Sequence, residues 1–407
     1  MFEEARLIDS IRRRLDGTIW TRTLVLFAIA VFCDRFGQGL LGGARMNFFI
    51  ETIGLSGSQV LWLEGIRELP GLALIFIAAL TMRMPLMRQA TLSLILMAFG
   101  YALFAFIGSY AGLLLAAVIA SFGFHLWIPL NSSIGLSLSD KESAGRVLGT
   151  LAGVGSLAAI AGMGAIAVIS SLFQDMPLGN YYILGGAFIF LAGLVFFFLP
   201  KDVGQTQVKP ARIVVKKRYW LYYVLIFLAG ARKLVLGSLI TLILVQDFHL
   251  RVQHMSALTF LSSLLIFLFA SRLGSLIDRF GERVTTTAAY GILAVCCLGF
   301  ATINHLWILL VLWVVIRLTM PLGMGLSTYV YRTAPPQELT PTLTAGVTFD
   351  HISSVGVPFL VTAVLPLIQY RGVFLATAAL IMISIPFARA LQVRADATPQ
   401  PILSTAD

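Results

Sequence analysis

Twelve apolar runs dominate this chain of 407 residues, and each is close to the length that crosses a lipid bilayer. A transmembrane helix needs roughly 20 apolar residues, because the hydrocarbon core is about 30 Å thick. The chain is 58% hydrophobic and 12% charged, whereas soluble proteins are about a quarter charged, so polar side chains are too few to cover a water-soluble body. We therefore predict an all-α membrane protein with twelve transmembrane helices. The expected spans are 23–50, 59–81, 89–108, 111–138, 145–172, 181–199, 219–246, 255–273, 285–303, 306–330, 343–368 and 372–391.

A basic break separates the first six runs from the last six. The expected organisation is an N-terminal cytoplasmic amphipathic segment at 1–22, a six-helix bundle at 23–199, a basic cytoplasmic linker at 200–218, a second six-helix bundle at 219–391 and a disordered tail at 392–407. A shift of 196 positions places Glu142 on Glu338 and Arg83 on Arg279. Such a parallel repeat predicts two bundles related by a pseudo-two-fold axis.

The basic residues follow the alternation that positive-inside topology requires. With a cytoplasmic N-terminus, 21 of the 29 Lys and Arg residues fall in the N-terminal segment, the even-numbered connections and the tail, or within three residues of them. Only Arg251 and Arg371 fall in the connections on the other side. We therefore expect a multi-pass protein of the plasma (inner) membrane with both termini cytoplasmic. The net charge of +10 then reflects orientation rather than a nucleic-acid partner.

One loop carries a recognisable motif. The stretch that follows the eighth run contains Gly274, Asp278, Arg279, Gly281 and Arg283 in the order G-x-L-x-D-R-x-G-x-R. This stretch resembles the signature of the major facilitator superfamily, whose members have two six-helix bundles and act by alternating access. The resemblance implies that these five residues form a cytoplasmic gate motif.

The first half lacks a good copy of the same motif. After the second run, Met82 stands where the resemblance requires an aspartate, and only Leu80 and Arg83 remain of the pattern. We expect the cytoplasmic gate of the first half to be latched differently or more weakly.

Charged residues inside the apolar runs are the strongest indication of a functional site. At roughly 2.5–3.5 kcal/mol each, their unpaired exposure to lipid would cost about 25–35 kcal/mol, so they must pair or face a water-filled cavity. They are Asp34, Arg35, Arg45, Glu64, Arg67, Glu68, Arg232, Lys233, Arg317 and Asp350. The resemblance implies that spans one, four, seven and ten line a central cavity. The candidate cavity residues on these spans are Arg35, His125, Arg232, Lys233 and Arg317.

Three places offer a carboxylate for proton coupling. Glu64, Arg67 and Glu68 are three or four positions apart and share one helix face. Arg67 can neutralise one of the two carboxylates and leave the other protonatable near neutral pH. Asp350 beside His351 is the second candidate, and Asp34 is the third. The structural alternatives are that Glu64 and Arg67 form an interhelical staple, that His125 is a packing histidine and that Arg45 snorkels to the interface.

These features predict a secondary transporter of a small solute, coupled to protons. The planar guanidinium group suits carboxylate or phosphate, which favours an anionic or zwitterionic substrate. A multidrug-type exporter and a non-transporting sensor or scaffold remain alternatives. The sequence contains no G-x-x-x-x-G-K-[ST], H-E-x-x-H or G-x-S-x-G motif, so we expect no direct use of ATP and no enzyme activity. We also expect no cofactor, no metal and a monomer in the bilayer.

Overall fold

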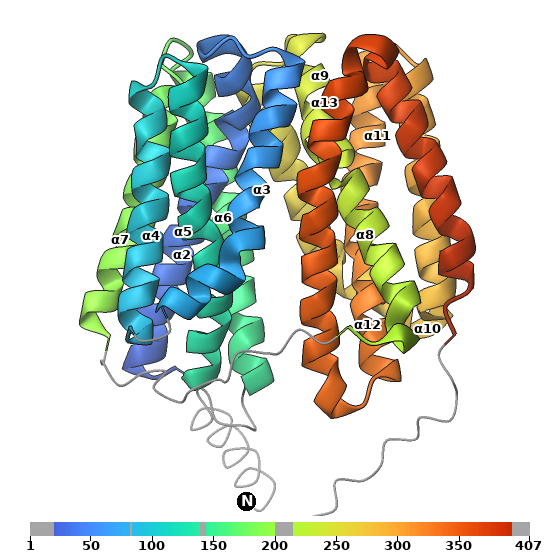
Figure 1. Ribbon diagram of the computed structural model, residues 1–407. Coiled ribbons are helices and arrows are strands. Elements are labelled where there is room, and N and C mark those ends of the chain that lie inside the picture. Colours follow the sequence, from blue (N-terminus) through green and yellow to red (C-terminus); the bar gives the residue numbers. More distant parts are fainter. Residues whose placement is uncertain (1–19, 82–83, 139–143, 200–214, 393–407) are drawn as a thin grey trace, which may run out of the picture. The chain divides into compact units, whose positions relative to one another are not determined.

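The computed structural model describes residues 20–81, 84–138, 144–199 and 215–392, and within these ranges the chain is helical with short connections (Figure 1). The expected amphipathic segment before Trp20, most of the basic linker and the tail after residue 392 lie outside the described residues. The chain forms two compact units. The first unit comprises Met1–Phe48, Ala73–Val208 and Val252–Phe260, and the second comprises Phe49–Leu72, Lys209–Arg251 and Leu261–Asp407. The units thus exchange two segments relative to the expected bundles, whose exact boundaries stay a prediction.

The first unit is built from five helices and the second part of a sixth. They are α2 (Arg22–Asn47), α4 (Leu86–Leu103), α5 (Tyr110–Ser137), α6 (Ala144–Leu172) and α7 (Gly179–Val195), with α3 (Gly57–Thr81) shared between the units. Helix α2 packs on α6 and α7, and α4 packs on α5 and α7. The hydroxyl of Thr21 caps α2 by accepting from the backbone N–H of Leu24 at 3.1 Å, which satisfies one of the free donors of the first turn.

The second unit contains the remaining helices. They are α8 (Trp220–Leu234), α9 (Ile240–Gln246), most of α10 (Val252–Thr302), α11 (Leu306–Thr319), α12 (Gly325–Thr333) and α13 (Pro336–Arg389). A π-helical turn over Val235–Leu239 joins α8 to α9. Helix α13 packs along α8.

Two long helices contain a break that divides them as the apolar pattern predicts. In α10 the backbone leaves the helical region at Gly281, where φ is 77°, a conformation that glycine adopts without steric cost. In α13 the break falls at Gln369, where φ is 54°. The first break separates the expected spans 255–273 and 285–303, and the second separates 343–368 and 372–391.

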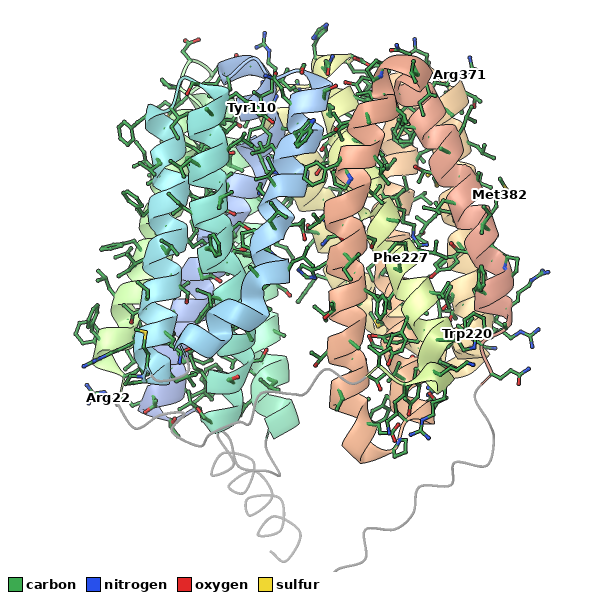
Figure 2. The ribbon with its side chains drawn as sticks, viewed as in Figure 1. Arg22, Tyr110, Trp220, Phe227, Arg371 and Met382 are labelled. Carbon is green, nitrogen blue, oxygen red and sulfur yellow. The ribbon has the colours of Figure 1, made fainter. Side chains whose placement is uncertain are left out.

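Ten helical segments among the described residues are long and apolar enough to cross a membrane. Helix α3 is not one of the ten, and 341–389 counts as a single segment despite the break at Gln369. The all-α polytopic architecture is confirmed, and the number twelve stays a prediction. In Figure 2, Arg22 and Tyr110 lie at opposite ends of the first unit, and Trp220 and Arg371 lie at opposite ends of the second, as the predicted topology requires.

Small residues set the distance between helices in the first unit. A Cβ added at Gly162 of α6 would lie 3.1 Å from the Cα of Gly39 in α2. A Cβ at Gly37 would lie 2.6 Å from the carbonyl oxygen of Gly185 in α7. Inside a bilayer, close backbone approach of this kind stabilises helix pairs by van der Waals packing, since lipid removes the hydrophobic driving force.

Candidate functional site

A fully buried carboxylate joins α2 to α5 in the first unit. Asp34 has no exposed surface, and both of its oxygens accept hydrogen bonds. The indole N–H of Trp127 donates to Oδ2 at 2.9 Å, and the amide of Gln38 donates to Oδ1 at 2.7 Å. The Nε of Arg35 lies 3.8 Å from Oδ2. Asp34 therefore holds two helices together and orients Arg35, and its role in proton coupling stays a prediction.

Arg35 lines a cavity of about 440 Å³ within the first unit. Helices α2, α5 and α6 supply the walls, which are formed by Val31, Arg35, Asn131, Ser132, Leu148, Leu151, Ala152, Gly155, Ser156 and Ala159. A Cβ at Gly155 would lie 3.2 Å from the Cγ of Arg35, so the absence of a side chain there gives the arginine room. We call this cavity the first-unit pocket.

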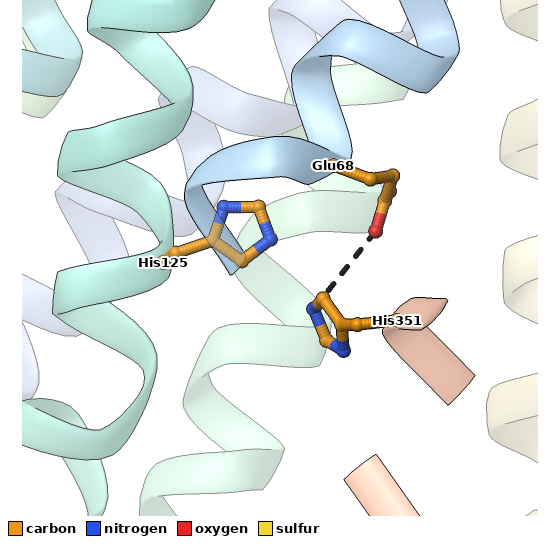
Figure 3. A group of neighbouring side chains, drawn as sticks. All are labelled: Glu68, His125 and His351. Carbon is orange, nitrogen blue, oxygen red and sulfur yellow. Dashed lines mark ion pairs between the residues drawn. The ribbon is translucent and has the colours of Figure 1, made fainter. Parts of the chain in front are cut away.

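His125, from the same unit, is engaged within its own helix. Its Nδ1 lies 2.9 Å from the carbonyl oxygen and 3.0 Å from the hydroxyl of Ser121. The ring is buried and is labelled on α5 in Figure 3. These contacts lie within α5, and the role of His125 as a cavity residue stays a prediction.

The second unit gathers four ionisable side chains from three distant places in the sequence. Lys233 on α8 has its Nζ 3.5 Å from Glu68 and 3.7 Å from Asp350. His351 has its Nε2 3.9 Å from the same carboxylate oxygen of Glu68, as the dashed line in Figure 3 shows. We call Glu68, Lys233, Asp350 and His351 the second-unit charge cluster. It combines a cation shared by two carboxylates with a histidine beside one of them.

The hydrogen bonding of His351 indicates which tautomer the neutral ring adopts. Nδ1 lies 2.9 Å from the carbonyl oxygen of Val347. A carbonyl can only accept, so we assign the proton of the neutral ring to Nδ1. Nε2 then carries the lone pair of the neutral ring, and it is the nitrogen that lies 3.9 Å from Glu68. If Nε2 is protonated, its lone pair is replaced by an N–H, and His351 and Glu68 form an ion pair.

Glu64 and Arg67, which share a face of α3 with Glu68, pair with each other. The NH1 of Arg67 donates to both oxygens of Glu64, at 3.0 and 3.1 Å, and Glu64 is buried. Arg67 therefore neutralises Glu64 and leaves Glu68 to Lys233 and His351.

The remaining candidate cations of the second unit lie on aromatic rings. The guanidinium of Arg232 is 4.1 Å from the ring centre of Tyr290, and the side chain is buried. Arg317 lies 5.7 Å from the ring centre of Trp313. A cation over an aromatic face is attracted by the ring quadrupole, so Arg232 is stabilised inside the unit. Its role and that of Arg317 as substrate ligands stay predictions.

The predicted gate motif contacts the end of α12 within the second unit, and its role as a gate stays a prediction. Arg332 donates to Asp278 at 2.8 Å and lies 3.1 Å from the buried carboxylate of Glu282. Gly281 makes the turn between them possible through its positive φ. The motif residues Gly274, Arg279 and Arg283 are partly or fully exposed. The degenerate first-half copy around Met82 lies outside the described residues.

Sequence reasoning missed the neutral polar residues of the first-unit pocket and an ion-pair network around Glu338. Lys216 lies 2.6 Å from Glu338, Arg218 pairs with the same carboxylate, and the hydroxyl of Tyr219 donates to it at 2.8 Å. Asn131 stands in an apolar run only six positions after His125, which was an available signal. A neutral amide inside a span costs less than a charge and is therefore easier to overlook.

Within its described residues the chain is helical, with ten membrane-length apolar segments, paired charges and a polar pocket. These features define the class of polytopic membrane proteins. Residues 221–406 match the family model of the Major Facilitator Superfamily. No curated protein matches the chain.

Solved structures extend the likeness to nearly the whole chain. The nucleoside transporter NupG is similar with a TM-score of 0.73 and 13% identity over 91% of this chain and 99% of that one. A bacterial homologue of the iron transporter ferroportin gives 0.73 and 14% over 91% and 99%. A bacterial homologue of the human lysosomal transporter Spinster gives 0.71 and 14% over 93% and 98%. The chain shares the fold of these structures, and the family model over residues 221–406, which contain the motif, confirms the resemblance drawn from it. Together these findings support transport as the general function.

Proposed function

We propose that the chain is a proton-coupled secondary transporter of a small anionic or zwitterionic solute, and that it works by alternating access. The observation that carries this proposal is the second-unit charge cluster. Lys233 is held between two carboxylates, while the Nε2 of His351 faces one of them. Groups of this kind inside a membrane-spanning unit are expensive and are typical of proton pathways.

The formal charge of the cluster indicates how many protons it takes. Lys233 contributes +1, Glu68 and Asp350 contribute −1 each, and a neutral His351 contributes nothing. The four groups therefore carry −1, and one added proton makes them neutral. A neutral cluster crosses between the two access states at lower electrostatic cost than a charged one, because the low dielectric of the interior penalises net charge.

Proton binding also changes the contacts of Lys233. When Glu68 pairs with a protonated His351, Lys233 is free to move fully to Asp350. The cluster thus has two ion-pair arrangements that differ by one proton. A two-state element whose balance depends on protonation is what coupling a proton to a conformational change requires.

The test is proton uptake by the purified protein in proteoliposomes, with pools of organic anions, sugars and lipophilic cations supplied in turn. We expect alkalinisation outside the vesicles with an anion pool. Glu68→Gln and His351→Asn should abolish solute-driven proton uptake while leaving solute exchange between the two sides intact. Glu51→Gln, a change of the same chemistry on an exposed side chain, is the matched control and should behave like the wild type.

Two results would overturn the proposal. Solute flux that ignores pH, with the same rate in Glu68→Gln and His351→Asn, would exclude proton coupling through this cluster. Proton flux only with lipophilic cations would make the chain a multidrug-type exporter instead.

We further infer that the protein sits in the plasma (inner) membrane with both termini cytoplasmic. The 21-to-2 distribution of basic residues in the connections supports this orientation. Reporter fusions test it: a fluorescent protein fused after Asp407 should fold and fluoresce, whereas alkaline phosphatase at the same position should be inactive. The reverse pattern would contradict the orientation.

A further inference from the structure

The first-unit pocket has an unusual charge composition for a cavity between membrane helices. Of the wall residues that the structure describes, Arg35 is the one that carries a charge, and none is a carboxylate. The other polar walls are neutral, and they are Asn131, Ser132 and Ser156. The remaining walls are aliphatic or glycine. A cavity of this composition favours one negative charge and several neutral hydrogen-bonding groups in its ligand.

Arg35 is held in a way that leaves its outer nitrogens to a ligand. Among the described residues, its one ion pair is the contact of Nε with Asp34 at 3.8 Å. Asp34 is buried behind it, and its oxygens are already hydrogen-bonded to Trp127 and Gln38. The Arg35 side chain keeps 36% of its surface exposed. The carboxylate therefore orients the guanidinium, while the two terminal nitrogens keep the planar fork that binds a carboxylate bidentately.

The cations of the second unit are less suited to the same task. Lys233 is shared by two carboxylates, Glu68 and Asp350. Arg232 is buried against the ring of Tyr290. An anion at either one would have to displace an existing partner or enter a closed region. Arg35 meets its carboxylate partner Asp34 through Nε alone and lines a cavity of about 440 Å³. An anion can therefore bind its two terminal nitrogens without displacing Asp34.

Asn131 adds a requirement for a neutral donor. Its side-chain oxygen is buried and, within the described part of the chain, has no hydrogen-bond partner. An unsatisfied buried acceptor costs about 1–3 kcal/mol, so a ligand hydroxyl or N–H placed there gains affinity. Ser132 and Ser156 are exposed to the cavity and can either donate or accept.

Charge balance then decides which ligand fits. Among the described wall residues, an ammonium group would find no carboxylate, and a dianion would find no cation besides Arg35. A hydroxyl group satisfies Asn131 and the two serines with no charge at all. The ligand that matches all of these walls carries one carboxylate and one or more hydroxyl groups.

We propose, as an extension of the transport function proposed above, that the first-unit pocket binds hydroxylated monocarboxylates such as sugar acids, with the carboxylate on Arg35 and the hydroxyls on Asn131, Ser132 and Ser156. Arg35 supplies affinity through its charge, and Asn131 supplies selectivity for hydroxylated over aliphatic acids. Gly155 keeps the space that the arginine side chain occupies.

The experiment measures equilibrium binding of labelled gluconate to the purified full-length protein in detergent, with no membrane and no gradient. Unlabelled hydroxy monocarboxylates of three to seven carbons compete for the site. The matched six-carbon probes are glucose, hexanoate, glucosamine and glucarate, which change the charge or remove the hydroxyls one feature at a time. We expect competition by hydroxy monocarboxylates, and at least tenfold weaker competition by all four matched probes.

Variants test the assigned residues. Arg35→Gln should weaken gluconate binding about 10–100-fold, the loss typical of a charge-assisted bidentate contact, and Arg35→Lys should recover part of it. Asn131→Leu should weaken gluconate but leave hexanoate unchanged or improved. Ser132→Asp adds a carboxylate to the pocket and should shift preference from gluconate toward glucosamine. Arg22→Gln, at an exposed position of the same helix, is the control and should bind like the wild type.

The thermal unfolding midpoint of each variant, within a few degrees of the wild type, separates a lost contact from a lost fold. Binding of no hydroxy monocarboxylate, or equal binding to wild type and a folded Arg35→Gln, would overturn the proposal. Such a result leaves proton coupling intact if an anion pool still drives proton uptake. Conversely, gluconate binding that needs Arg35 stands even if Glu68→Gln and His351→Asn transport normally.

Discussion

The hydrogen bond from Trp127 to Asp34 offers the most direct test of how the first unit is held together. Both side chains are almost completely buried, with exposed fractions of 1% and 0%. The indole N–H lies 2.9 Å from the carboxylate, and a hydrogen bond to a charged group contributes about 1.5–3 kcal/mol. Replacing Trp127 by Phe removes the donor and also some ring volume, so the single substitution overstates the bond.

A double-mutant cycle isolates the bond from the change in volume. Trp127→Phe is measured in the wild type and in Asp34→Leu, which has no acceptor, because the volume loss is common to both backgrounds. We expect the substitution to cost about 1.5–3 kcal/mol less in Asp34→Leu than in the wild type. The assay is unfolding in mixed micelles by increasing SDS mole fraction, followed by intrinsic fluorescence.

The matched control is Trp307→Phe, at a position that is 71% exposed. It should change stability by no more than about 0.5 kcal/mol, as surface substitutions do. A coupling energy below about 0.5 kcal/mol, which is the limit of additivity for independent sites, would refute the buried hydrogen bond as a support of the α2–α5 contact.

Three further predictions test other parts of the molecule. Gly162→Val should push α6 away from Gly39 in α2 and lower the SDS midpoint of unfolding. The expected loss of stability is about 1–3 kcal/mol, which is the usual cost of overpacking. An unchanged midpoint would contradict the close contact. Glu338→Gln should release Lys216, so a spin label at the exposed neighbouring residue Val215 should gain mobility by electron paramagnetic resonance. An unchanged spectrum would contradict the ion pair. Burial raises the pKa of the Asp247 carboxyl just beyond α9, so the native state binds that proton more tightly than the unfolded state. The stability that this group contributes is therefore fully present below the unfolded pKa and is lost as pH rises through the native pKa. In Asp247→Asn this pH-dependent loss of stability should disappear. SDS titrations of the variant and the wild type between pH 4 and 8 measure the difference.

The sequence predicted the helical architecture because the bilayer leaves few alternatives. An apolar run of the right length must be a helix, since lipid satisfies no backbone hydrogen bond. The same reasoning found the charged residues, because each costs free energy inside the membrane. It also grouped Glu64, Arg67 and Glu68 on one face, since helical spacing is local.

The sequence could not tell which charges meet. Glu68 and Lys233 are 165 positions apart, and their contact depends on how α3 and α8 pack rather than on any spacing. For the same reason, Arg232 and Lys233 looked equivalent in the sequence, although one lies on Tyr290 and the other between carboxylates. The pocket around Arg35 depends on how three helices pack and on the absence of a side chain at Gly155. The pattern of apolar residues along the sequence predicts neither feature.

The charges of the two proposed sites together predict whether transport depends on the membrane potential. The second-unit charge cluster carries −1 and takes one proton, while the first-unit pocket takes a monoanion on one arginine. One proton and one monoanion moved together carry no net charge. Transport should therefore be electroneutral, driven by the pH difference and not by the membrane potential. Proteoliposomes clamped with valinomycin and potassium test this: gluconate accumulation should be the same at 0 and at about −100 mV, although that potential is worth about 2.3 kcal/mol per elementary charge. Accumulation that rises with the potential would show that more than one proton accompanies each anion. A group of the cluster or the pocket that is treated as neutral would then have to carry a charge.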